Sequence, residues 1–233
     1  MSPANAWRWC VVAGIATLIA STAFGYLGIK PCGDTGGAGA IIALELVRTP
    51  EALVQLFLGY GQGRACADAL LAAHERALVL DGFAFIPAYG IFLFHGAKAL
   101  TPAHARLACM AMAAVLVAAL LDEVEGLILF QLIGIWESPP DLFDALFWVV
   151  RPKFALLGIG EILIAALLLR GTWFAKIAAL PMIAGGLASL YFLFANPYDP
   201  LMMQGHRWAW TALLIVAVAA AIRPSLVARP EPA

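Results

Sequence analysis

The chain has 233 residues, of which 63% are hydrophobic and 12% are charged, and its mean hydropathy is +0.90. Soluble domains carry roughly 25% charged residues, so this composition indicates an integral membrane protein. The net charge of −1 and the lack of basic runs argue against a nucleic-acid-binding surface. We therefore expect membrane lipids, and no nucleic acid, among the partners of the chain.

Six apolar stretches approach the length of about 20 residues that a helix needs to cross a bilayer. No long polar linker separates them, so we expect one domain, residues 1–233, that folds as an all-α bundle of about six transmembrane helices. The expected spans are residues 9–29, 77–97, 104–130, 142–169, 174–195 and 208–222.

Basic residues predict the orientation, because they gather in the short loops on the cytoplasmic side of a membrane. If the N-terminus is cytoplasmic, most basic residues of the short loops fall inside, and most acidic ones fall outside. The basic residues on the inner side are then Arg8, Lys98, Arg106, Arg170, Lys176, Arg223 and Arg229. We therefore expect a multi-pass protein of the bacterial inner (plasma) membrane with both termini in the cytoplasm.

The longest segment between two spans is residues 30–76, which we expect to form an outer loop. Thr49 and Pro50 predict the start of a short helix, with Thr49 as the N-cap and Pro50 in the first helical position. Such a helix would lie on the membrane surface or cap the bundle. Cys32 and Cys66 both fall in this loop. Because the outer side of a bacterial membrane is oxidising, we predict a disulfide between them.

The second span carries polar and aromatic residues on one helical face. Asp81, Phe85 and Tyr89 lie four residues apart and share that face. Pro87 cannot donate a helical hydrogen bond, so we expect a kink near it. Asp81 lies about one turn inside the outer boundary, and as an alternative it is a helix-end carboxylate that reaches water.

The third span contains the acidic stretch Leu121-Asp122-Glu123-Val124-Glu125. At the centre of a bilayer each ionised side chain costs about 2.5–3.5 kcal/mol on insertion scales, so these carboxylates require protein or water around them. Asp122 and Glu125 are one turn apart and share a face, whereas Glu123 points elsewhere. As an alternative, the span ends at Leu121, and residues 127–136 form a separate short helix.

The fourth span brings basic residues to the same depth. Arg151 and Lys153 flank Pro152, and Glu161 lies deeper on the same helix. Opposite charges at matching depth make buried charge tolerable, so we predict a polar cluster in the outer half of the membrane. The candidate catalytic residues are Asp81, Asp122 and Glu125, and the candidate binding residues are Phe85, Tyr89, Arg151, Lys153 and Glu161. The alternative is an ion-pair network that only fixes helix register.

The predicted spans place the four histidines near helix ends or in loops. These are His74, His95, His104 and His206. Paired haem ligation at mid-membrane depth is therefore not expected, and no CxxC, HExxH or GxGxxG pattern occurs, so the sequence predicts no metal site and no cofactor.

Several different short motifs are spread over residues of about 41–160. They are Ala43-Leu44-Glu45-Leu46, Leu80-Asp81 with Phe85, Pro87 and Tyr89, Leu121-Asp122-x-x-Glu125, and Lys153. This pattern resembles a loosely defined group of bacterial multi-pass membrane proteins without an assigned function. In that group the motif that begins here at Leu121 often ends in Glu-Asn, whereas Gly126 follows Glu125 here, so the side-chain amide is lost. The resemblance implies the architecture more than an activity.

Three functions fit the predicted cluster. It could bind a small amphiphile or lipid, with proton transfer by Asp122 or Glu125 if the protein is an enzyme. It could relay protons or ions in a transporter. It could also hold helices together in a structural subunit, with a membrane-protein partner or a second copy of the chain.

Overall fold

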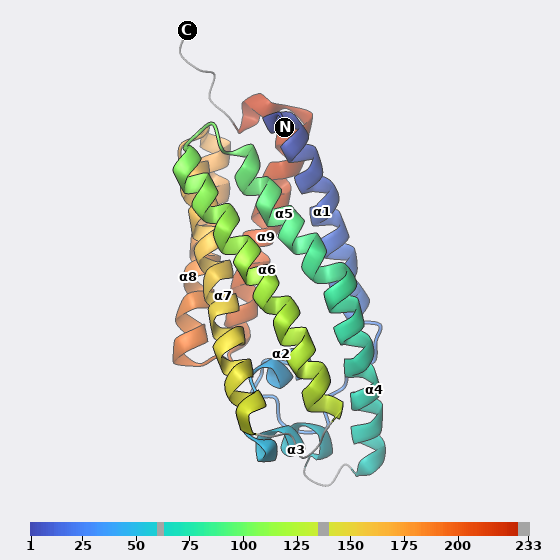
Figure 1. Cartoon of the computed structure of the whole chain (residues 1–233). Coiled ribbons are helices and arrows are strands. Elements are labelled where there is room, and N and C mark those ends of the chain that lie inside the picture. The colour runs from blue at the N-terminus through green and yellow to red at the C-terminus, as the bar shows by residue number, and fades with distance from the viewer. Residues whose placement is uncertain (60–62, 135–139, 228–233) are drawn as a thin grey trace.

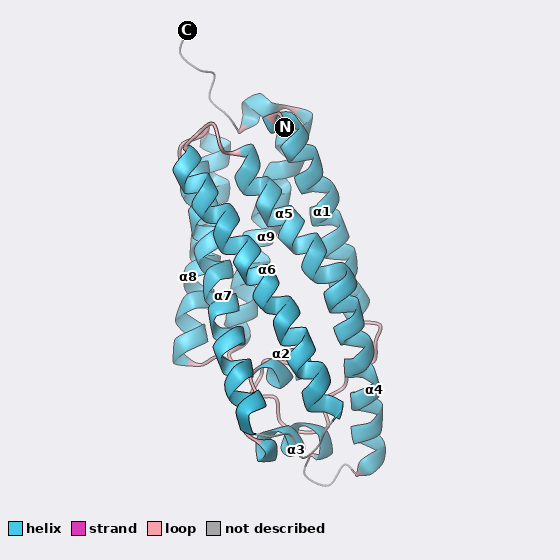
Figure 2. Cartoon of the chain, viewed as in Figure 1, coloured by secondary structure: helices cyan, strands magenta, loops and turns pink. Residues whose placement is uncertain are grey.

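The computed structural model describes residues 1–59, 63–134 and 140–227, and within these ranges the chain is helical with no β-strand (Figure 2). The predicted all-α fold is therefore confirmed. A π-helical turn, η1 (Asp81–Phe85), joins α4 to α5. The long helices are α1 (Pro3–Phe24), α4 (Arg64–Leu80), α5 (Ile86–Ala99), α6 (Ala105–Gly134), α7 (Pro140–Leu168), α8 (Trp173–Ala195) and α9 (Pro200–Ile222).

The long helices run side by side in one bundle (Figure 1). Helix α7 packs between α6 and α8, α8 also packs on α9, and α1 packs on α5 and α9. The start of α1 and the end of α9 lie at the same end of the bundle, and the short helices α2 (Ala40–Glu45) and α3 (Pro50–Leu58) lie at the other end (Figure 1). An even number of helix crossings places these two helix ends on one side.

Five helical segments are long and apolar enough to cross a membrane. They are α1, the continuous segment Arg64–Ala99, α6, α8 and α9. The sixth expected span, α7, has 29 residues, or about 43 Å at 1.5 Å per residue. It carries five charged residues, of which Lys153 and Glu161 are buried and Asp141 and Asp144 are exposed. The length of α7 thus suits a crossing, and its two buried charges face protein.

The outside of the bundle is apolar, as a lipid-facing surface requires. Large hydrophobic side chains such as Leu120, Leu127, Ile177 and Leu180 are more than half exposed. A soluble monomer rarely exposes an extended apolar surface. The interior contains many small residues, which let helices approach closely in membranes.

The second long helix differs from the sequence-based expectation in where it starts and in the turn that precedes Pro87. The second long helix starts at Arg64, so the later part of the expected loop 30–76 is helical. Directly before Pro87, where a kink was expected, the Ile86 N–H donates to the Asp81 carbonyl oxygen across η1. Pro87 itself lies in the first turn of α5, where a missing N–H costs little.

Helix α6 decides between the two interpretations of the acidic stretch. It runs without a break from Ala105 to Gly134, so a separate helix starting after Leu121 is wrong. Residues 135 and 136, which that alternative included, lie outside the described residues.

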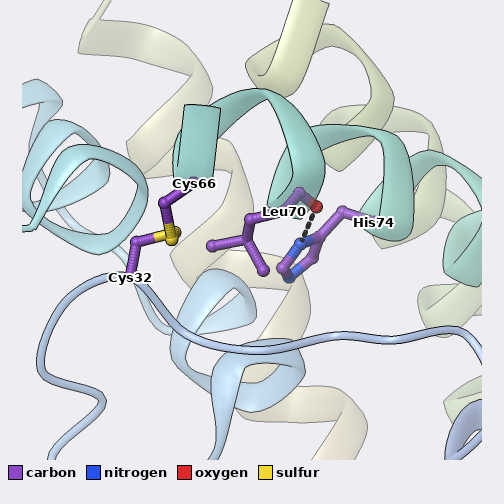
Figure 3. Close-up of a disulfide and its surroundings, with 4 residues drawn as sticks. All are labelled: Cys32, Cys66, Leu70 and His74. Atoms are coloured by element: carbon purple, nitrogen blue, oxygen red, sulfur yellow. Dashed lines mark hydrogen bonds between the residues drawn. A yellow bond between two sulfur atoms is a disulfide. The ribbon is translucent and has the colours of Figure 1, made fainter. Parts of the chain in front are cut away.

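The segment between α1 and α4 is tied to α4 at two points, one of which is the disulfide drawn in Figure 3. Cys32 forms a disulfide with Cys66 in the first turn of α4, with Cα atoms 5.9 Å apart, and this is the pairing that the sequence predicts. About two turns further along α4, the His74 ring nitrogens lie 2.9 Å from the Leu70 carbonyl oxygen and 3.3 Å from the Ala40 carbonyl oxygen. These links fix the place of α2 under the bundle.

Replacing both bonded cysteines with serine is expected to lower the free energy of unfolding by about 2–4 kcal/mol, because the unfolded chain loses a cross-link. Thermal unfolding in detergent with and without reductant would measure the effect. Cys109 is free and exposed, so Cys109→Ser is the control and should leave the midpoint unchanged. An unchanged midpoint in the double variant would contradict a structural role for the disulfide.

Among the described long helices, the closest contact that depends on glycine is the one between α8 and α9. A Cβ atom built on Gly185 would lie 2.2 Å from the Gly205 carbonyl oxygen. Gly185→Ala is therefore expected to force the two helices apart and to cost about 1–3 kcal/mol of stability. Gly126→Ala is the matched control, because nothing lies within 4 Å of a Cβ there. Equal thermal midpoints for the two variants would refute this packing.

Candidate functional site

Lys153 lies at the centre of a buried charge cluster. Its Nζ is 3.0 Å from Asp122 Oδ1, 3.1 Å from Glu45 Oε2 and 2.5 Å from Glu125 Oε2. The first two contacts have hydrogen-bond geometry, and the third is a close charge contact without it. These four side chains, which we call the lysine cluster, are each at most 9% exposed. An ammonium group has three donors, and three carboxylates surround this one.

Three different helices supply the lysine cluster. Asp122 and Glu125 are one turn apart on α6, as the sequence predicts, and both are buried. Lys153 follows Pro152 on α7, which packs along α6. Glu45 is the last residue of α2, and it was not among the predicted site residues. Its only signal in the sequence was its place in the resemblance motif, because a lone glutamate in a loop has no pattern of its own.

The lysine cluster has more carboxylates than cations. Breaking a buried ion pair by removing one partner costs about 3–5 kcal/mol, because the other charge stays buried and unpaired. The carboxyl group of Glu45, which lies outside the long helices, reflects this excess of acidic groups. Burial raises its pKa, and the charge of Lys153 offsets this increase only in part. The cluster is therefore a place where a proton or another cation is stabilised.

An aromatic group adjoins the lysine cluster through Tyr89. The Tyr89 hydroxyl donates to Asp122 Oδ2 at 2.6 Å. Its ring stacks on Trp210 with centroids 5.3 Å apart, and Phe85 lies 5.5 Å from Tyr89 and 5.9 Å from Trp210. We call Phe85, Tyr89 and Trp210 the aromatic wall. Both oxygens of Asp122 are thus held, one by Lys153 and one by Tyr89.

Glu161 and His206 form a second buried pair, separate from the lysine cluster. Glu161 Oε1 lies 2.8 Å from His206 Nδ1 and accepts a hydrogen bond from Trp210 Nε1 at 2.6 Å. The expectation that His206 lies at a helix end or in a loop is wrong: it is buried within α9. The predicted sixth span began at residue 208 and so excluded it.

Arg151 does not join either cluster. Its Nη1 donates to the Leu193 carbonyl oxygen at 2.9 Å, and its guanidinium lies over the Phe147 ring. Residues two apart on a helix point to different sides, so Arg151 faces α8 when Lys153 faces α6. The prediction that both bases meet the carboxylates is therefore wrong for Arg151.

A cavity of about 480 Å³ is lined by residues of the lysine cluster, by the aromatic wall and by His206. Asp81, Asp122, Glu45 and Lys153 line one part of it, and the aromatic wall, Phe154 and His206 line another. Exposed residues, among them Ser21, Gly25, Gly39 and Arg207, form its rim, so the cavity opens at the surface of the bundle. Of the predicted site residues, Asp81, Phe85, Tyr89, Asp122 and Lys153 line it. Glu125, Glu161 and Arg151 do not.

The part of the chain that the structure describes contains no group of three or more His, Cys, Asp or Glu side chains arranged to hold a metal ion. The titratable side chains that line the cavity include carboxylates, a lysine, a tyrosine and a histidine. Comparison of the chain with family models, with curated proteins and with solved structures gave no match.

Lys153→Met is expected to destabilise the protein by about 3–5 kcal/mol, because it leaves three buried carboxylates without their cation. Thermal unfolding in detergent would measure the change. Lys30 is exposed, so Lys30→Met is the matched control and should unfold like the parent protein. A stable Lys153→Met protein would show that the carboxylates do not depend on this ammonium group.

Proposed function

We propose that this protein binds a small amphiphile or a membrane lipid in the cavity of about 480 Å³. The observation that carries the proposal is the composition of the cavity wall, where a buried charge cluster and an aromatic surface face the same space. Ligand sites are typically concave and largely apolar, with a few convergent polar groups, and have volumes of about 300–1,000 Å³. Such a site suits a molecule with a polar head and an apolar chain.

The place of the cavity supports an amphiphile over a water-soluble ligand. The bundle has five apolar helical segments long enough to cross a membrane, and its outer surface is apolar. The cavity is lined by α1, α5, α7 and α9 as well as by α2. A lipid could thus place its head at the charged groups while its chain contacts the aromatic wall or leaves the cavity toward the membrane.

Asp122 is the residue best placed for acid–base chemistry in this site. It lines the cavity, and its two oxygens accept from Lys153 and Tyr89 at 3.0 and 2.6 Å. A general acid or base must lie within hydrogen-bond reach of the proton that it transfers. A ligand that displaced Tyr89 or approached Asp122 beside it would meet this condition. If the protein is an enzyme, Asp122 is the candidate proton carrier.

Met203→Trp is expected to fill the cavity and to reduce the amount of amphiphile that copurifies with the protein several-fold. Met203 lines the cavity from α9. Ile215→Trp is the matched control, because Ile215 is on the same helix and is 55% exposed. Extraction of the purified proteins and mass spectrometry of the extract would measure the bound molecules.

Equal loss of bound amphiphile in both variants, or no loss in either, would refute the proposal. If neither variant loses bound amphiphile, the lysine cluster would instead have a transporter role or a structural role. A proton flux assay in vesicles would then separate these two roles, because only a transporter responds to Asp122→Asn by losing flux.

A further inference from the structure

We propose that the ligand of the cavity is an amphiphile whose head ends in a primary ammonium group. This inference rests on the proposed function and names the class of ligand for the same site. It follows from counting which hydrogen-bonding side chains at the cavity already have partners and which do not.

The buried side-chain donors at the cavity are all in use. Lys153 directs its ammonium group to three carboxylates. The Tyr89 hydroxyl donates to Asp122, and the Trp210 indole N–H donates to Glu161. A ligand that needs buried donors, such as a phosphate or carboxylate placed deep in the cavity, would have to break one of these bonds.

The side-chain groups left without a partner are acceptors. No described residue donates a hydrogen bond to the Asp81 carboxylate, which lines the cavity from η1. His206 Nε2 is buried and also has no hydrogen-bond partner. In the neutral ring the hydrogen bond to Glu161 assigns the proton to Nδ1, so Nε2 carries a lone pair. The free groups therefore fit a ligand that brings N–H or O–H donors.

The charge of the cavity selects a cation among such donors. Four carboxylates lie on or next to the cavity, those of Glu45, Asp81, Asp122 and Glu125, and Lys153 is the only buried ammonium among the described residues that line it. A bound ammonium group would partly balance this excess. The aromatic wall adds to the fit, because cations are attracted to the faces of Trp, Tyr and Phe rings.

Arg207 is placed to bind the phosphate group of a phospholipid head. It is exposed and lies at the rim of the cavity, where it does not oppose the buried acceptors. A phosphate that adjoins the ammonium group would reach this guanidinium when the ammonium lies inside. The head that matches both features is a phosphoethanolamine.

A series of three lysophospholipids with the same acyl chain tests this inference. Their heads are ethanolamine, which has three N–H donors, choline, which has the charge without donors, and glycerol, which has O–H donors without the cation. The detergent-purified protein would be titrated with each and its lipid adducts quantified by native mass spectrometry. We expect the ethanolamine lipid to bind about ten-fold or more tightly than the other two, as charge-assisted hydrogen bonds predict.

Two aspartate variants complete the test. Asp81→Asn is expected to remove most of the preference for the ethanolamine head, because it removes a charge and an acceptor at the cavity. Asp68→Asn is the matched control, since Asp68 is exposed on α4 and does not line the cavity. It should bind the three lipids like the parent protein.

The outcomes separate this inference from the proposed function. Equal binding of all three lipids, lost in Met203→Trp, would overturn the ammonium preference and leave amphiphile binding intact. Tighter binding of the choline lipid would overturn the donor argument. If none of the three lipids binds, both the inference and the function on which it rests would be overturned.

Discussion

The structure depends on the contact between one ammonium group and three carboxylates inside a membrane bundle. Lys153 joins α7 to α6 through Asp122 and Glu125, and to α2 through Glu45. None of these side chains could be ionised in hydrocarbon without its partners. The cluster therefore fixes the register of α6 against α7. It also holds α2 at the end of the bundle, where that short helix closes one side of the cavity.

The second long helix is not a regular α-helix where it lines the cavity. The π-helical turn Asp81–Phe85 joins α4 to α5 and presents Asp81 and Phe85 to the same space. Turns of this kind are frequent at functional sites. The disulfide and the His74 contacts fix the segment that carries α2 against α4. A polar site is thus built between a locally irregular helix and a covalently restrained cap.

The presence of charged residues within the long helices could be predicted from the sequence, but the side chains that they contact could be predicted only in part. The pairing of Asp122 with Lys153 was predicted from helical spacing and from matching depth, and the two side chains do form a hydrogen bond. Arg151 met the same depth criterion, yet it faces α8, because depth says nothing about the direction of a side chain around the helix axis. His206 was excluded by a span boundary drawn a few residues too late, since the start of α9 is more polar than its remainder.

By itself the sequence determined that the chain lies in a membrane, that it forms long helices and that buried carboxylates need a basic partner. These properties follow from composition and local spacing, which act over a few turns of one helix. The tertiary structure alone decided that Glu45 belongs to the lysine cluster, that Glu161 pairs with His206, and that an aromatic wall faces both groups. These contacts join residues that are 33 to 108 positions apart in the chain. Only the packing of the helices brings such residues together, because no local preference of the chain encodes the angle at which one helix meets another.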